Sequence, residues 1–231
     1  CIKYLECALL LTTANCAGNR RKVATEDTLS AVQNIMCNHS TNKAIMLNCC
    51  RFVAQLSVES EVVRLIVLSS GVNESMTDYL EQLAGVCDDE TAEVFTRTAA
   101  LLCADHLDDQ IRFFASPHCI SLYVAIMKKD ISRKVLISGH FCRLLMVLTE
   151  PGFGFVVDAL LKSNFAIELQ RMVGDFLRFN VAAMLSCLRF VFFICLSSPD
   201  FRTRFHSAGV TQQLLAFLQA NSNNSDAIIT S

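Results

Sequence analysis

The residue pairs that could support catalysis or metal binding are few and isolated in this sequence. Cys103 and His106 could share a helical face, but the neighbouring sequence does not supply the further ligands that zinc prefers. His118 and Cys119 lack an evident orienting group for a nucleophilic dyad. The Gly-Phe-Gly segment at 152–154 lacks the third glycine of a nucleotide-binding loop. We therefore expect a non-enzyme, with no catalytic residues, no metal and no cofactor.

Widely spaced arginines indicate a more specific chemistry, which is the binding of acidic groups. A guanidinium presents a planar set of donors that suits bidentate contacts with a carboxylate or phosphate. If the helices carrying Arg143 and Arg189 pack about 8–10 Å apart, one short peptide can contact both residues. The predicted partner-binding residues are Arg51, Gln55, Arg143, Arg189 and Phe193.

A repeat of about 45 residues would position these arginines. The anchor positions of the repeat are 44, 47, 45 and 46 residues apart: Cys7, Arg51, Thr98, Arg143 and Arg189. Apolar or small residues recur at offsets −2, +1, +2 and +5, the spacing of one helical face. Offsets 0 and +4 should point away from that face. Large apolar residues follow 29 positions after the anchors: Met36, Leu80, Met127, Met172 and Leu218. Each repeat is expected to contain a long, a short and a medium helix.

Two segments of the sequence resemble the armadillo repeat. Residues 48–71 read NCCRFVAQLSVESEVVRLIVLSSG, and residues 186–209 read SCLRFVFFICLSSPDFRTRFHSAG. The resemblance implies an all-α fold, a right-handed superhelical solenoid of about five three-helix repeats, whose long helices line a concave groove for extended peptides. A HEAT-like solenoid is the alternative, because only two repeats keep the glycine.

The resemblance also separates this chain from one armadillo subgroup and brings it closer to another. The sequence has no tryptophan and no asparagine at offset +4, so it departs from the importin-α-type readers of nuclear-localisation signals. Its arginines resemble the basic groove of catenin-like repeats, which receives acidic segments. We therefore expect an extended, acidic or phosphorylated protein segment as the partner.

The repeats would occupy nearly all of the chain. Their expected bounds are 1–40, 41–86, 87–131, 132–178 and 179–220, which together form one armadillo-like domain at 1–220. The polar tail at 221–231 is either a linker or the start of a further repeat. Because the sequence opens at Cys1 within a helix-like segment, we expect a piece of a longer protein.

Composition limits the partners and the compartment. With 20 basic and 22 acidic residues, the chain lacks the basic field that nucleic-acid binding requires. The most apolar segment, 181–196, carries Arg189 near its centre, which argues against membrane insertion. The 12 cysteines form no Cys-x-x-Cys pair, and most lie among apolar residues. They are expected to be buried free thiols, which indicates a reducing compartment, and we expect a cytoplasmic protein.

Structural interpretations compete with the binding site. In one interpretation, Arg189 has no binding role and merely extends its side chain from the core to the surface. In another, the arginines pair with acidic residues of neighbouring repeats. Phe192 and Phe193 either widen the binding face or, as we favour, pack in the core. The alternative function is a structural subunit buried in a large ciliary, trafficking or organellar complex, to which the high apolar content is suited.

Overall fold

The computed structural model describes residues 17–58, 60–82, 88–103, 114, 119–120, 135–148, 154–163, 165–176 and 181–221. These residues form α-helices joined by short turns, and no strand occurs among them. The expectation of an all-α chain is therefore confirmed. The chain divides into two compact units, which we call unit 1 (Cys1–Leu122) and unit 2 (Tyr123–Ser231).

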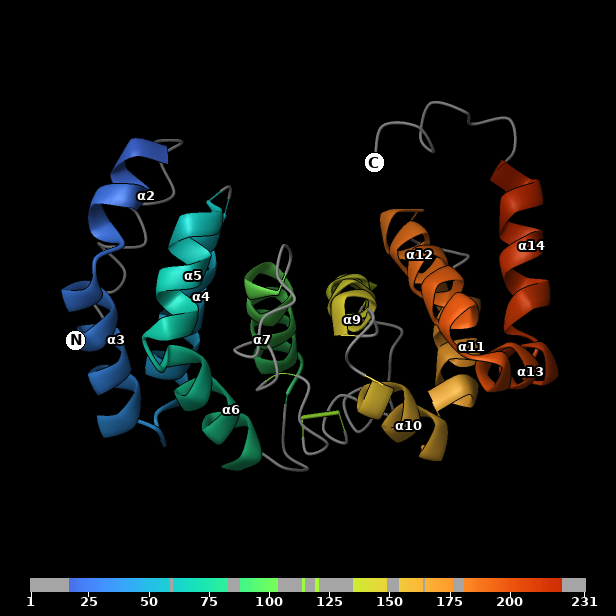
Figure 1. The fold of residues 1–231 in the computed structure, drawn as a ribbon, viewed down its shortest axis with the longest axis horizontal. Coiled ribbons are helices and arrows are strands. Elements are labelled where there is room, and N and C mark those ends of the chain that lie inside the picture. The colour runs from blue at the N-terminus through green and yellow to red at the C-terminus, as the bar shows by residue number, and fades with distance from the viewer. Residues whose placement is uncertain are drawn as a thin grey trace. The chain divides into compact units, whose positions relative to one another are not determined.

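In unit 1, helix α4 is the central long helix and contacts both α3 and α7 (Figure 1). The helix α6 packs on α3, and the short α5 follows α4 closely and packs against it. The helices of unit 1 are α2 (Ala17–Val23), α3 (Glu26–Asn38), α4 (Lys43–Ser57), α5 (Glu61–Ser69), α6 (Val72–Gln82) and α7 (Asp89–Leu102).

In unit 2, the two long helices α9 and α12 make the most extensive helix–helix contact. The medium helix α11 packs against α12, α13 and α14. The helices of unit 2 are α9 (Val135–Leu148), α10 (Gly154–Lys162), α11 (Phe165–Phe176), α12 (Val181–Ser197), α13 (Pro199–Ser207) and α14 (Val210–Asn221).

The long helices recur at a constant interval along the chain. Their described parts start at Lys43, Asp89, Val135 and Val181, each 46 residues after the preceding one. After α4, α9 and α12 comes a helix of 9 residues, and then one of 11 or 12 residues. The predicted order of long, short and medium helices is confirmed at these three places. The first long helix, expected around Cys7, lies outside the described residues.

Side-chain caps and glycines determine where the helices begin and end. The side chains of Ser60 and Ser198 accept hydrogen bonds from backbone N–H groups in the first turns of α5 and α13. Pro199 opens α13, where its missing N–H costs little. Gly71 and Gly209 separate the short helices from the medium ones and have φ angles of 77° and 80°. These left-handed conformations favour glycine over residues with a side chain.

The predicted apolar face of the long helices is buried. All four offsets are buried in α4 and in α12, and the described offsets of α9 are buried too. The residues concerned are Cys49, Phe52, Val53, Leu56, Leu144, Leu145, Leu148, Cys187, Phe190, Val191 and Ile194. The residue at offset +29 lies near the end of its helix in both α3 and α14, but its burial differs: Met36 is fully buried, whereas Leu218 is 38% exposed.

Candidate functional site

The ninth residue of every described long helix is an arginine. Helices α4, α7, α9 and α12 carry Arg51, Arg97, Arg143 and Arg189 at this position, at intervals of 46 residues. We call these residues the ninth-position arginines. Arg97, Arg143 and Arg189 are exposed, and Arg51 is half-exposed. Each helix therefore presents a guanidinium on a face other than its core face.

The anchor predicted for α7 is wrong by one residue. Thr98 is fully buried, and its hydroxyl donates to the carbonyl oxygens of Val94 (2.6 Å) and Cys50 (3.2 Å). It therefore joins α7 to α4 and is not available to a ligand. Arg97 occupies the exposed position, and the sequence signal that identifies it is an arginine every 46 residues.

A groove in unit 1 lies between α4 and α7 and contains two of the predicted binding residues. Arg51 and Gln55 of α4 line it together with Arg97 of α7. Its volume is about 260 Å³, and the remaining lining residues are Ala54, Glu90, Glu93, Val94 and Thr98. The two arginines and two glutamates of the lining balance in charge, so this groove has no strong preference for an acidic ligand.

The carboxylates at the start of α7 already occupy Arg51. Its Nη2 atom lies 2.7 Å from an Oε1 atom of Glu90, and its Nη1 donates to Asn48 Oδ1 at 3.2 Å. Lys43 Nζ lies 3.1 Å from Glu90 and 2.5 Å from Asp88. The interpretation that an arginine pairs with an acidic residue of a neighbouring repeat is therefore correct for Arg51. Arg97, by contrast, makes no ion pair with any described residue.

The same network lowers the pKa values of its carboxyl groups. Burial acts to raise the pKa of Asp88, but hydrogen bonds from Lys43 and from the backbone and side chain of Thr91 outweigh it and lower the pKa to about 2. Hydrogen bonds from Arg51 and Lys43 lower the pKa of Glu90. Asp88 also caps α7, since its Oδ1 accepts from Thr91 N at 2.9 Å. The acidic run at residues 88–90 thus begins α7, where its negative charge complements the helix dipole.

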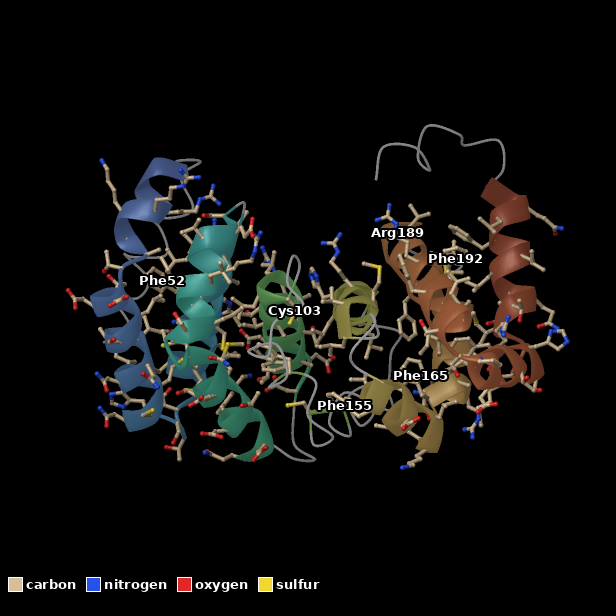
Figure 2. The ribbon with its side chains drawn as sticks, viewed as in Figure 1. Phe52, Cys103, Phe155, Phe165, Arg189 and Phe192 are labelled. Carbon is tan, nitrogen blue, oxygen red and sulfur yellow. The ribbon has the colours of Figure 1, made fainter. Side chains whose placement is uncertain are left out.

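In unit 2 the exposed arginines lie on helices without acidic residues. Neither α9 nor α12 contains an aspartate or glutamate, and the two helices pack together. Arg143 is exposed on α9. Arg189, which is labelled in Figure 2, is exposed on α12. Arg143 forms no ion pair with a described residue. Two packed helices therefore offer positive charge without carboxylates of their own.

Two aromatic side chains lie beside Arg189. Phe192 is 62% exposed and Phe193 is 43% exposed, and their rings are in edge-to-face contact with centroids 5.8 Å apart. The expectation that these phenylalanines pack in the core is wrong, because they lie outside the buried face formed by Phe190 and Ile194. Phe193 instead lies with Arg189 on the accessible part of α12.

The other residues considered for chemistry do not assemble into a site among the described residues. Cys103 is fully buried, and burial raises the pKa of its thiol, which disfavours a reactive thiolate. His106 and His118 lie outside the described residues, and Cys119 is buried. No group of three potential metal ligands occurs in the described part of the chain.

No described helix is both long and apolar enough to cross a membrane. What the arrangement offers chemically is binding through guanidinium groups and exposed aromatic rings. Comparison of the chain with protein-family models, with curated proteins and with solved structures finds no significant match.

Proposed function

We propose that this chain is an armadillo-like scaffold that binds an extended acidic or phosphorylated protein segment through its ninth-position arginines. The 46-residue interval between long helices and the repeated order of helix lengths support this kind of repeat. In this proposal the chain performs no catalysis. It acts in the cytoplasm, for which the free thiols of its buried cysteines are suited.

The observation that carries the proposal is the charge of the helix pair α9 and α12. Arg143 and Arg189 are exposed on two packed helices that have no carboxylate. Axes of packed helices lie about 8–10 Å apart, which is within the reach of a few extended residues. A segment with carboxylates or phosphates can therefore contact both guanidinium groups, and Phe193 offers apolar contact beside them.

The two units differ in the carboxylates that lie near their ninth-position arginines. In unit 1, Arg51 would have to exchange Glu90 for the ligand, and Glu93 lies in the same groove as Arg97. In unit 2, neither α9 nor α12 contains an aspartate or glutamate, and Arg143 forms no ion pair with a described residue. We therefore assign the primary binding site to Arg143 and Arg189, and a secondary one to Arg97.

A binding assay with charge-reversed variants tests the proposal. A fluorescent oligoglutamate peptide and a phosphoserine peptide would be titrated with the full chain, with Arg143→Glu/Arg189→Glu and with Arg202→Glu. Arg202 is exposed on the short helix α13, is not one of the ninth-position arginines, and serves as the matched control. We expect the double variant to lose roughly tenfold in affinity per arginine, since hydrogen bonds to charged groups contribute about 1.5–3 kcal/mol each.

The salt dependence and the control decide the outcome. Affinity of the unmodified chain should fall as ionic strength rises, because exposed charges are screened. Equal affinities for the unmodified chain and the Arg143→Glu/Arg189→Glu variant would show that these residues do not form the site.

The alternative function is a structural subunit of a large assembly, and exposed apolar residues of unit 2 favour it. Ile167, Leu196 and Leu215 are more than half exposed, on three different helices. A subunit of this kind should aggregate when it is produced alone. Size-exclusion chromatography with light scattering distinguishes the two, because the scaffold should elute as a single species of defined mass.

A further inference from the structure

The groove between α4 and α7 of unit 1 is lined by four charged residues, of which two already pair with each other. The Nη2 atom of Arg51 lies 2.7 Å from Oε1 of Glu90, so these two charges offset each other within the fold. Glu93 and Arg97 also line the groove, and neither makes an ion pair with a described residue. Arg97 is exposed and Glu93 is half-buried, so both side chains are accessible. The groove therefore keeps one negative and one positive charge available to a ligand.

The positions of Glu93 and Arg97 define how far apart the charges of a ligand should lie. The two residues are four positions apart on α7, so they share one side of the helix and are about 6 Å apart along its axis. In an extended chain, side chains two residues apart point to the same side and are separated by about 6.6 Å. An extended segment that lies along α7 can therefore place one side chain against each of the two charges.

The size and the apolar lining of the groove favour the side chains of a protein segment over a whole small molecule. Its volume is about 260 Å³, whereas pockets for small molecules usually have volumes of about 300–1,000 Å³. Ala54 and Val94 also line the groove, and they expose only 6% and 9% of their surface. This apolar lining can contact the methylene groups of a lysine or glutamate side chain. Charge pairs that form in such a partly buried place are screened less by salt than fully exposed pairs.

We propose that this groove binds an extended segment of a partner protein in which a basic and an acidic residue lie two positions apart. The basic side chain pairs with Glu93, and the acidic one pairs with Arg97. The inference rests on the proposed scaffold function and specifies the ligand chemistry of its secondary site at Arg97. Charge complementarity selects the segment, because a uniformly acidic segment would meet the carboxylate of Glu93 and a uniformly basic one would meet the guanidinium of Arg97.

Short capped peptides with a defined order of charges test the proposal. Gly-Lys-Thr-Glu-Gly and Gly-Glu-Thr-Lys-Gly carry opposite charges two residues apart, whereas Gly-Glu-Thr-Glu-Gly and Gly-Lys-Thr-Lys-Gly are the like-charged controls. Each peptide would be titrated into the full chain by nuclear magnetic resonance, in which the backbone amide signals of α7 report binding in the groove separately from binding at Arg143 and Arg189. We expect at least one mixed-charge peptide to bind about three- to tenfold more tightly than both like-charged peptides. The preferred order of charges gives the direction of the segment along α7.

Reversal of a single charge should change the preference of the groove in a direction set by the residue. Glu93→Lys leaves two positive charges, so the peptide with two glutamates should become the preferred ligand. Arg97→Glu leaves two negative charges, so the peptide with two lysines should become the preferred one. A new preference cannot result from loss of folding, and circular dichroism would verify that the helices are preserved. Asp78→Asn and Lys22→Gln remove exposed charges from α6 and α2, which do not line the groove, and should leave the preference unchanged.

Three results would overturn the inference. These are equal affinity of the groove for mixed-charge and like-charged peptides, an unchanged preference in Glu93→Lys and Arg97→Glu, or binding of the free zwitterion glutamine as tightly as the best peptide, which would make a small molecule the ligand. Failure of the inference is distinguishable from failure of the proposed function. Arg143→Glu/Arg189→Glu should weaken oligoglutamate binding and leave the mixed-charge peptides unaffected at α7. Glu93→Lys should weaken the mixed-charge peptides at α7 and leave oligoglutamate binding at Arg143 and Arg189 in place.

Discussion

Replacement of Phe190 by alanine should strongly destabilise unit 2. Phe190 is fully buried on α12, and its ring lies 5.6 Å from that of Phe165 on α11, at an interplanar angle of 80°. Phe165 in turn contacts Phe201 of α13 with ring centroids 6.4 Å apart. The substitution removes a buried ring and leaves a cavity where three helices meet. Such changes cost about 3–5 kcal/mol, to which the lost edge-to-face contact contributes.

Phe192 provides the matched control for this prediction. It lies two residues further along the same helix and is 62% exposed, so Phe192→Ala makes the same chemical change without a cavity. Exposed substitutions of this kind change stability by no more than about 0.5 kcal/mol. Urea unfolding followed by far-ultraviolet circular dichroism measures both variants. Similar losses for the two, or a small loss for Phe190→Ala, would refute the assignment of the core face of α12.

Three further predictions concern the assignment of Arg97, the charges of unit 1 and the glycine turns. Thr98→Glu should lower the free energy of unfolding of unit 1 by at least about 3 kcal/mol, because it buries an unpaired charge, whereas Arg97→Glu should change this free energy little. Urea unfolding measures both variants, and equal losses of stability would contradict the burial of Thr98. The pKa of Asp88 is lowered from 3.8 to about 2, so its charge stabilises the fold above pH 3.8, and this contribution is lost as the pH falls towards 2. The difference in unfolding free energy between the unmodified chain and Asp88→Asn, which keeps a good helix cap, should therefore shrink as the pH falls from 3.8 towards 2. A difference that stays constant over this range would contradict the lowered pKa of Asp88. Gly209→Ala should lower the free energy of unfolding by about 1 kcal/mol, because Gly209 has a φ of 80°. Gly154→Ala should leave stability unchanged, because a Cβ atom there meets no neighbouring atom within 4 Å. Thermal unfolding of the two variants distinguishes these outcomes.

The helices and their buried faces could be predicted from the sequence because these features depend on local patterns. Offsets −2, +1, +2 and +5 follow helical periodicity, and Gly71 and Gly209 mark turns that need a left-handed conformation. The predicted anchor on α7 was misplaced because nearly all of that helix is buried. Thr96, Thr98 and Ala99 are all at zero exposure, so two neighbouring registers satisfied the apolar pattern equally well.

The details of the candidate site depend on contacts between helices that are distant in sequence. Glu90 reaches Arg51 across 39 residues. No local pattern indicates that this pair forms, or that Arg97 makes no ion pair with a described residue. Phe192 and Phe193 were predicted to lie in the core because they belong to an uninterrupted run of apolar residues in the sequence. Their exposure follows from which helices lie beside α12, and that information is absent from the sequence of α12 alone.

The most direct measurement of the central claim observes the guanidinium groups themselves. In a nuclear magnetic resonance titration of the full chain with oligoglutamate, the Nε–H signals of Arg143 and Arg189 should shift together and saturate at the same ligand concentration. The signal of Arg202, on α13, should stay in place. Shifts of equal size at all three arginines, or none at Arg143 and Arg189, would contradict the claim that these residues form an acid-binding site.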